Sequence, residues 1–131
     1  IVLLSGKLYG YAESQNRSKP WMCIDFKTGE TIFQTAPVKS GYKYKNGCLT
    51  YADGMFYLFS DNGNMVLVKP SVNGSEATGF EIAGRLKLKD RGKRPTWAHP
   101  VVFGGRLYIR YGDKLGVYNV LKTGEEEKSK L

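Results

Sequence analysis

Histidine, cysteine and long apolar runs are scarce in this sequence, and each scarcity excludes a class of protein. The 131 residues include one histidine, His99, so no cluster of histidines can bind a metal ion within the chain. The two cysteines, Cys23 and Cys48, form no CxxC pair of the kind that binds zinc. No stretch approaches the roughly 18 consecutive apolar residues of a membrane-spanning helix, so we expect neither a metal site nor a membrane span.

Helical periodicity is missing as well. No segment repeats apolar residues at the i, i+3, i+4 and i+7 spacing of an amphipathic helix. The sequence is rich instead in residues of strands and tight turns, with 16 glycines, 9 tyrosines and 6 phenylalanines. We therefore predict an all-β fold. For the two cysteines, we favour buried free thiols in strands. A disulfide between them is the alternative if the protein is exported.

Positive charge exceeds negative charge by 8, and much of the excess lies in residues 85–94. In this segment basic side chains alternate with Leu86 and Leu88. Such a pattern is typical of a strand at a sheet edge, where charge prevents pairing with other sheets. A surface for nucleic acid normally adds aromatic or motif signals. We predict a solvated edge strand and no nucleic-acid partner.

A short pattern recurs three times along the chain. It reads glycine, any residue, leucine or phenylalanine, then tyrosine, and its copies begin at Gly6, Gly54 and Gly105. These glycines are about 50 residues apart, which is the length of one four-stranded blade of a β-propeller. Each glycine and the residue before it form a dipeptide suited to a two-residue hairpin turn. The pattern predicts propeller blades, which are four-stranded antiparallel sheets.

The repeat also predicts where the strands lie. First strands are expected at 1–4, 48–52 and 99–103, each followed by a turn and a second strand. Third strands are expected at 21–26, 65–69 and 115–120, and outer strands at 31–35 and 80–88. Polar stretches at 13–20 and 70–78 are expected to be loops. The chain divides into blades at approximately 1–37, 38–94 and 95–124, the last without an outer strand, and a charged tail at 125–131.

One segment resembles the repeat of pyrroloquinoline-quinone (PQQ) propellers. The motif of that family runs Ala-x-Asp-x-x-Thr-Gly-x-x-x-Trp across the turn between the third and fourth strands. Residues 23–33 match it at Asp25, Thr28 and Gly29, with Phe33 in place of the tryptophan. Thr-Gly forms the turn, the aspartate accepts hydrogen bonds from turn amides, and the aromatic side chain packs between blades. A degraded copy follows at 117–125, with Asn119 near the aspartate position.

The resemblance implies a partial PQQ-like propeller of the periplasm or cell envelope of a bacterium. It implies a non-catalytic scaffold that presents blade loops to a protein or envelope polymer. The alternative is part of a PQQ-dependent quinoprotein alcohol or polyol dehydrogenase, an oxidoreductase that binds PQQ and Ca²⁺. The carboxylate ligands, aspartate base and adjacent cysteines of those enzymes cannot be placed in this sequence, so we expect no cofactor in this chain. Calorimetry with PQQ and Ca²⁺ would separate the two hypotheses.

Three residues are candidates for ligand contacts, and no catalytic residue is proposed. Trp97 could stack on a planar ligand or pack between blades. His99 could contact a ligand or transfer a proton, or it could be a packed residue at the start of its strand. Arg110 places a charge where the other two units have an aromatic residue. The repeat itself explains the tyrosines at its fourth position, which are Tyr9, Tyr57 and Tyr108.

Three blades are too few to close a propeller, which has typically about 4–8. We therefore expect a fragment completed by further blades of its parent chain, or a homo-oligomer. In a closed ring the blade flanks bury apolar side chains such as Leu8, Phe56 and Leu107. Uncovered flanks on the first and last blades should drive self-association, most simply to a two-fold dimer that pools six blades.

Overall fold

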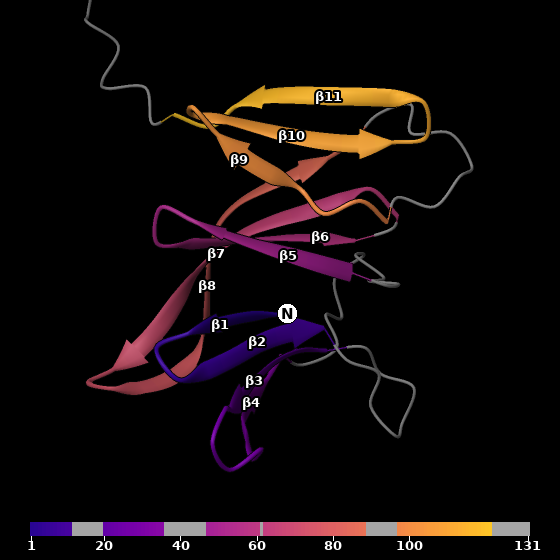
Figure 1. Ribbon diagram of the computed structural model, residues 1–131. Helices are drawn as coiled ribbons and strands as arrows, with labels where there is room; N and C mark the ends of the chain where they lie inside the picture. Colours follow the sequence, from indigo (N-terminus) through magenta and orange to yellow (C-terminus); the bar gives the residue numbers. More distant parts are fainter. Residues whose placement is uncertain (12–19, 36–46, 61, 89–96, 122–131) are drawn as a thin grey trace, which may run out of the picture.

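The computed structural model describes residues 1–11, 20–35, 47–60, 62–88 and 97–121. These residues form eleven strands and no helix, which confirms the predicted all-β class for them. None of them therefore belongs to a helix able to span a membrane. The strands make three antiparallel sheets, each built from consecutive strands. In Figure 1 the sheets are stacked as three layers, with the first sheet at the bottom and the third at the top.

Each sheet keeps the order of its strands in the sequence. The first sheet contains β1 (Val2–Leu4), β2 (Lys7–Tyr11), β3 (Trp21–Asp25) and β4 (Thr31–Gln34). The middle sheet contains β5 (Gly47–Ala52), β6 (Met55–Ser60), β7 (Asn64–Asn73) and β8 (Glu76–Lys87). The third sheet contains β9 (Val101–Phe103), β10 (Arg106–Tyr111) and β11 (Lys114–Asn119).

A two-residue turn joins the first two strands of every sheet, as the repeated pattern predicts. Both turn residues have positive φ, with 50° and 72° at Ser5-Gly6, 50° and 76° at Asp53-Gly54, and 56° and 70° at Gly104-Gly105. Positive φ at both positions gives the turn a twist that matches the right-handed twist of the strands. The predicted hairpins are therefore confirmed.

The hairpin of β7 and β8 corrects the prediction of a loop at 70–78. β7 runs through Pro70 as far as Asn73 and β8 begins at Glu76, so paired strands replace most of the expected loop. Proline is tolerated because β6 pairs with β7 only as far as Val68, and a strand that has lost a neighbour has fewer ladder hydrogen bonds to lose. The overlooked signal is Asn73-Gly74, a dipeptide typical of hairpin turns.

Of the other predictions, one is corrected by the structure, and some fall wholly or partly outside the described residues. β9 begins at Val101, so His99 precedes the strand that it was expected to start. β8 is an edge strand that contains Arg85 and Lys87, as predicted for the basic segment. The rest of that segment at 89–94, the expected loop at 13–20 apart from Pro20, and the charged tail lie outside the described residues.

Apolar side chains fill both spaces between the sheets. β6 supplies both because its side chains alternate: Phe56 and Leu58 face the first sheet, and Tyr57 and Phe59 face the third. All four are at most 3% exposed. Burial on both faces explains why β6 is an almost unbroken apolar run, unlike a strand with one face in water.

The two cysteines lie in different clusters of the core. Cys23 is buried between the first and middle sheets, whereas Cys48 packs on the side of the third sheet. Both are free thiols, as predicted from the sequence, but only Cys23 is fully buried, whereas Cys48 is half-buried. Burial raises the pKa of the Cys48 thiol to about 11. Both thiols pack among apolar side chains, and the Cys48 thiol also donates a 3.7 Å hydrogen bond to the carbonyl of Ala98.

The first strands of neighbouring sheets lie side by side. β1 contacts β5, and β5 contacts β9. Thr50 Oγ1 on β5 donates a 2.6 Å hydrogen bond to the carbonyl of Pro100, just before β9. At the opposite side of the sheets β4 contacts β8. The sheets therefore follow one another in one orientation, first strand beside first strand.

Candidate functional site

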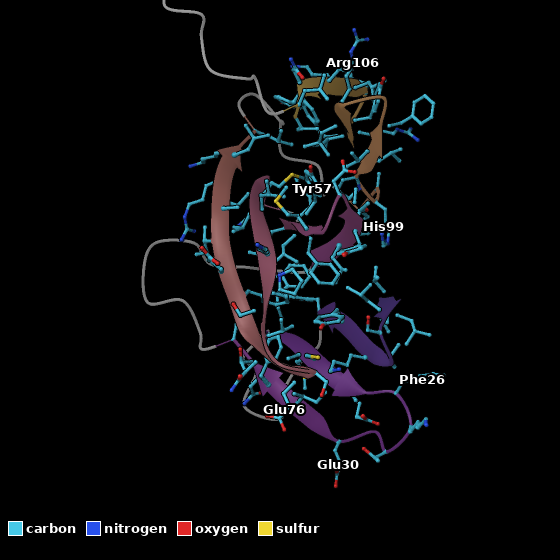
Figure 2. The ribbon with its side chains drawn as sticks, turned by 90° about the vertical axis from the view of Figure 1, so that its left-hand side faces the viewer. Phe26, Glu30, Tyr57, Glu76, His99 and Arg106 are labelled. Carbon is cyan, nitrogen blue, oxygen red and sulfur yellow. The ribbon has the colours of Figure 1, made fainter. Side chains whose placement is uncertain are left out.

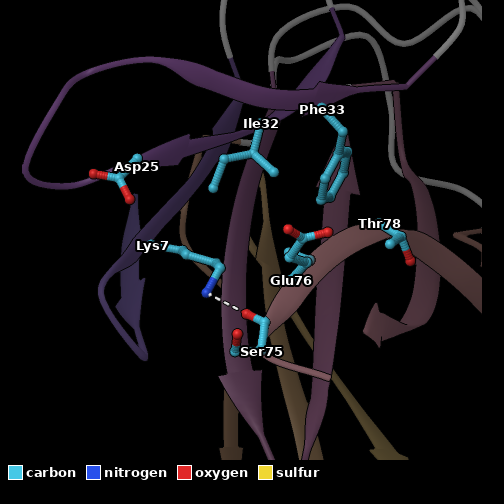
Figure 3. Close-up of a pocket in the computed structure, with 8 residues that line it drawn as sticks. Lys7, Asp25, Ile32, Phe33, Ser75, Glu76 and Thr78 are labelled. Atoms are coloured by element: carbon cyan, nitrogen blue, oxygen red, sulfur yellow. Dashed lines mark hydrogen bonds between the residues drawn. The ribbon is translucent and has the colours of Figure 1, made fainter. Parts of the chain in front are cut away.

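A pocket lies between the first sheet and the far end of the β7–β8 hairpin (Figure 3). Its volume is about 630 Å³. Lys7 Nζ donates a 3.0 Å hydrogen bond to the carbonyl of Ser75 and so ties the hairpin end to β2. The lining combines three charged side chains with an apolar wall and comprises Lys7, Asp25, Ile32, Phe33, Ser75, Glu76, Ala77 and Thr78.

Asp25, at the edge of this pocket, is held as a carboxylate by its own turn. Its Oδ1 accepts hydrogen bonds from the amides of Thr28 at 2.9 Å and Lys27 at 2.8 Å. These bonds hold the pKa of Asp25 below its usual range. The carboxylate therefore acts as a hydrogen-bond acceptor for the turn. Among the described residues no three His, Cys, Asp or Glu side chains are grouped so that they could hold a metal ion.

The other residues of the motif at 23–33 also stabilise the turn or the packing between sheets. The amide of Gly29, where φ is 74°, donates to the carbonyl of Asp25 at 2.9 Å and closes the turn. Phe33 packs edge-on against Phe80 of the middle sheet, with ring centroids 5.1 Å apart. In the degraded copy Asn119 Oδ1 accepts from the amide two residues later at 3.0 Å, as Asp25 does. The Thr-Gly of that copy lies outside the described residues.

The three repeated tyrosines point the same way from their sheets and differ in what covers them. Tyr9 and Tyr57 are each 3% exposed, and burial raises the pKa of both, that of Tyr9 to about 12. The ring of Tyr9 packs on that of Phe56, with centroids 4.6 Å apart. Figure 2 shows Tyr57 between the middle and third sheets. Tyr108 is only half-buried, because it lies on the outer face of the third sheet.

The three candidate ligand contacts all lie at the surface near the third sheet. Trp97 is 73% exposed and does not pack between the sheets of this structure, in contrast to Trp21, which is 3% exposed. His99 is exposed on the side where the first strands lie (Figure 2). Arg110 is exposed on β10, opposite Leu115. None of the three lines the pocket of Figure 3.

The outer face of the third sheet is an exposed apolar surface that we name the tyrosine face. Cross-strand pairing places one row across it, in which Tyr108 lies between Val101 and Val117. Its apolar side chains are exposed by 54% at Val101, 75% at Phe103, 63% at Leu115 and 49% at Val117. The complete face consists of Val101, Phe103, Arg106, Tyr108, Arg110, Leu115, Val117 and Asn119.

The outer face of the first sheet is a second apolar surface, which we name the leucine face. It carries Leu3, Leu8 and Ile24 in one cross-strand row, together with Ile1 and Met22. Ile1 is 82% exposed and Leu3 54% exposed, whereas the others are half-buried. Leu8 therefore lies on an uncovered flank of the first sheet, as expected, and Phe56 at the same repeat position of the middle sheet is buried. Leu107 of the last sheet is also buried, so the uncovered flank of that sheet carries Tyr108 instead.

Sequence reasoning missed the pocket because it required the long β7–β8 hairpin. It expected an uncovered flank on the last sheet but placed Leu107 there instead of Tyr108, although Val101 and Phe103 alternate with Val102 in a pattern that puts apolar residues on both sides of the strand. A comparison of the chain with protein-family models, curated proteins and solved structures finds no match in any of the three. The function must therefore be argued from the geometry of the chain itself.

Proposed function

We propose that the chain is a non-catalytic binding scaffold of the bacterial cell envelope, built from consecutive blades of a PQQ-like propeller. The propeller is supported by the uniform orientation of the sheets and by the contacts of β5 with β1 and β9. The envelope location is supported by the resemblance of residues 23–33 to the PQQ-propeller motif. In this proposal the partner is a protein or an envelope polymer.

The observation that carries the binding function is the tyrosine face. Its aliphatic and aromatic side chains form one surface across three strands, and contiguous apolar surface of this kind on a soluble protein marks an interaction site. Arg106 and Arg110 add hydrogen-bond donors to the same face, and Arg and Tyr are enriched in protein interfaces. Figure 2 shows Arg106 beyond the third sheet, on the side away from the middle sheet.

The tyrosine face extends over all three strands of the third sheet, in contrast to the short turns between first and second strands. The turns between the first two strands of the sheets contain only two residues each. Interfaces draw their affinity from a few apolar and aromatic anchors packed at the centre of a contact surface. We therefore place the partner on the tyrosine face rather than on these loops.

Photo-cross-linking with matched positions tests the proposal. Phe103 of the tyrosine face is replaced by benzoylphenylalanine in the full chain, which is then irradiated in a bacterial envelope extract. Phe26, which is 58% exposed in the β3–β4 turn, is the control position. We expect a discrete adduct from position 103 and none from position 26. No adduct at 103, or the same adducts at both positions, would contradict the proposed function.

A further inference from the structure

We infer that the partner of the tyrosine face is the leucine face of a second copy of this chain. The inference rests on the proposed function, since it names the occupant of the same surface. Its basis is that the molecule already contains two interfaces of this type, one between each pair of neighbouring sheets.

The first internal interface lies between the first and middle sheets. The first sheet contributes the side that carries the repeated tyrosine, and the middle sheet contributes the side that carries the repeated leucine or phenylalanine. Tyr9 lies in a cross-strand row with Val2 and Cys23, and all three pack in the first core cluster. The facing row of the middle sheet holds Phe56, at the repeat position of Leu8, with Tyr51 and Val68 as its cross-strand neighbours.

The second internal interface repeats this arrangement one sheet further along the chain. Tyr57 and its neighbour Leu67 belong to the cluster between the middle and third sheets. The facing row consists of Leu107, again at the repeat position of Leu8, with Val102 and Tyr118. In both interfaces, then, the side that carries the repeated tyrosine packs on the side that carries the repeated leucine or phenylalanine.

The two end faces of the stack are consequently different: one is a tyrosine side and the other is a leucine side. The third sheet exposes the tyrosine side, and the first sheet exposes the leucine side with Leu8, Leu3 and Ile24. A second copy can therefore extend the stack by the same packing that holds it together internally. Such a contact is head-to-tail, and it closes into a ring or continues as a chain of copies. Two copies supply six sheets, within the range of about 4–8 at which propellers close.

The arginines of the tyrosine face are compatible with this contact. Arg106 occupies the repeat position of Lys7, which in the first internal interface donates to the backbone carbonyl of Ser75 on the next sheet. A long basic side chain at this position thus reaches across to a neighbouring sheet without disrupting the apolar contact. Arg110 can lay its aliphatic stem on an apolar surface while its guanidinium stays in water.

Complementary blocking variants of the full chain test the inference by sedimentation velocity over a concentration series. Val117→Glu blocks the tyrosine face and Leu3→Glu blocks the leucine face, at side chains that are 49% and 54% exposed. Ile82→Glu, 52% exposed and outside both faces, is the matched control. Phe103→Ser and Ile1→Glu are second variants for the two faces, and circular dichroism checks that every variant stays folded.

We expect the wild type and Ile82→Glu to associate alike, and each blocking variant alone to associate more than about tenfold more weakly. An equimolar mixture of Val117→Glu and Leu3→Glu should recover a one-to-one dimer, because one copy keeps an intact tyrosine face and the other an intact leucine face. A monomeric wild type at every concentration would overturn the inference. So would self-association of Leu3→Glu alone at wild-type strength, which would mean that two tyrosine faces pair.

The cross-linking experiment separates failure of this inference from failure of the proposed function. An adduct between position 103 and a second copy supports both. An adduct with a different macromolecule, together with a monomeric wild type, would show that the partner of the tyrosine face is not a second copy. The scaffold function would then still be supported. Absence of any adduct at position 103 overturns the scaffold function.

Discussion

Strands β6 and β10 occupy the same place in the repeat and meet different surroundings. β6 lies between two sheets, and Phe56 and Tyr57 on its opposite faces are 0% and 3% exposed. β10 has a sheet on one side only, so Leu107 is 2% exposed and the following Tyr108 is half-buried. The repeat therefore determines the direction in which a side chain points, whereas the neighbouring sheet determines whether that side chain is buried.

This comparison separates residues that stabilise the fold from residues available to a partner. The repeated tyrosine is buried between sheets at Tyr9 and Tyr57 but half-exposed at Tyr108. The face that carries Tyr108 can therefore accept the same kind of neighbouring sheet. Four predictions on stability follow in order of decreasing effect, beginning with the contrast between covered and uncovered positions.

Two leucines at one repeat position provide the largest contrast. Leu107→Ala should lower the free energy of unfolding by about 2–5 kcal/mol, because Leu107 is 2% exposed and its removal leaves a cavity. Leu8→Ala should cost clearly less, since Leu8 is half-buried on the uncovered leucine face. Urea unfolding at low protein concentration measures both. Equal losses would mean that the leucine face is covered in the isolated chain.

The contact between the first and middle sheets is tight at Gly47, where added volume should be destabilising. A Cβ at Gly47 would lie 2.9 Å from the indole of Trp21 and 3.1 Å from the carbonyl of Phe59. We expect Gly47→Ala to cost about 1–3 kcal/mol, as overpacking does. Gly84→Ala is the control, because its Cβ would have only the Leu67 Cβ at 3.8 Å. Thermal unfolding that ranks Gly84→Ala as the more damaging change would contradict the packing described.

How much of this structure the sequence could predict depends on the range of the interactions. The hairpin turns and the Asp25 turn were predictable because glycine conformation and amide hydrogen bonds act within a few residues. The start of β9 and the exposure of Trp97 were not, since they depend on which neighbours meet the chain in space. The pocket depends on Lys7 meeting Ser75, 68 residues away, and no local pattern encodes that contact.

Buried Tyr9 should make stability fall at alkaline pH. Its pKa is raised from 10.0 to about 12, mainly by burial, so the neutral phenol is favoured in the folded state. Its contribution is fully present below pH 10 and is lost as pH rises through about 12. Tyr9→Phe should therefore lose less stability than the wild type over this range. Urea unfolding at a series of pH values measures the difference, and identical slopes would show that Tyr9 ionises as an exposed tyrosine does.

The smallest effect concerns the turn at Asp25. The amides of Thr28 and Lys27 lower the pKa of this carboxyl, so its contribution is present at neutral pH and is lost as pH falls through the lowered pKa. Asp25→Asn should remove this acid dependence while keeping an acceptor oxygen, as Asn119 does in the third sheet. Thermal unfolding between acid and neutral pH tests the expectation. An unchanged acid profile in the variant would contradict it.

Amide hydrogen exchange at several protein concentrations tests most directly whether the end sheets are binding surfaces. The account predicts that β6 is strongly protected at every concentration, because both of its faces are covered within one chain. It predicts that β2 and β10 are less protected in dilute solution and gain protection together as the concentration rises. Protection of β2 and β10 that equals that of β6 in dilute solution, or that never changes with concentration, would contradict the account.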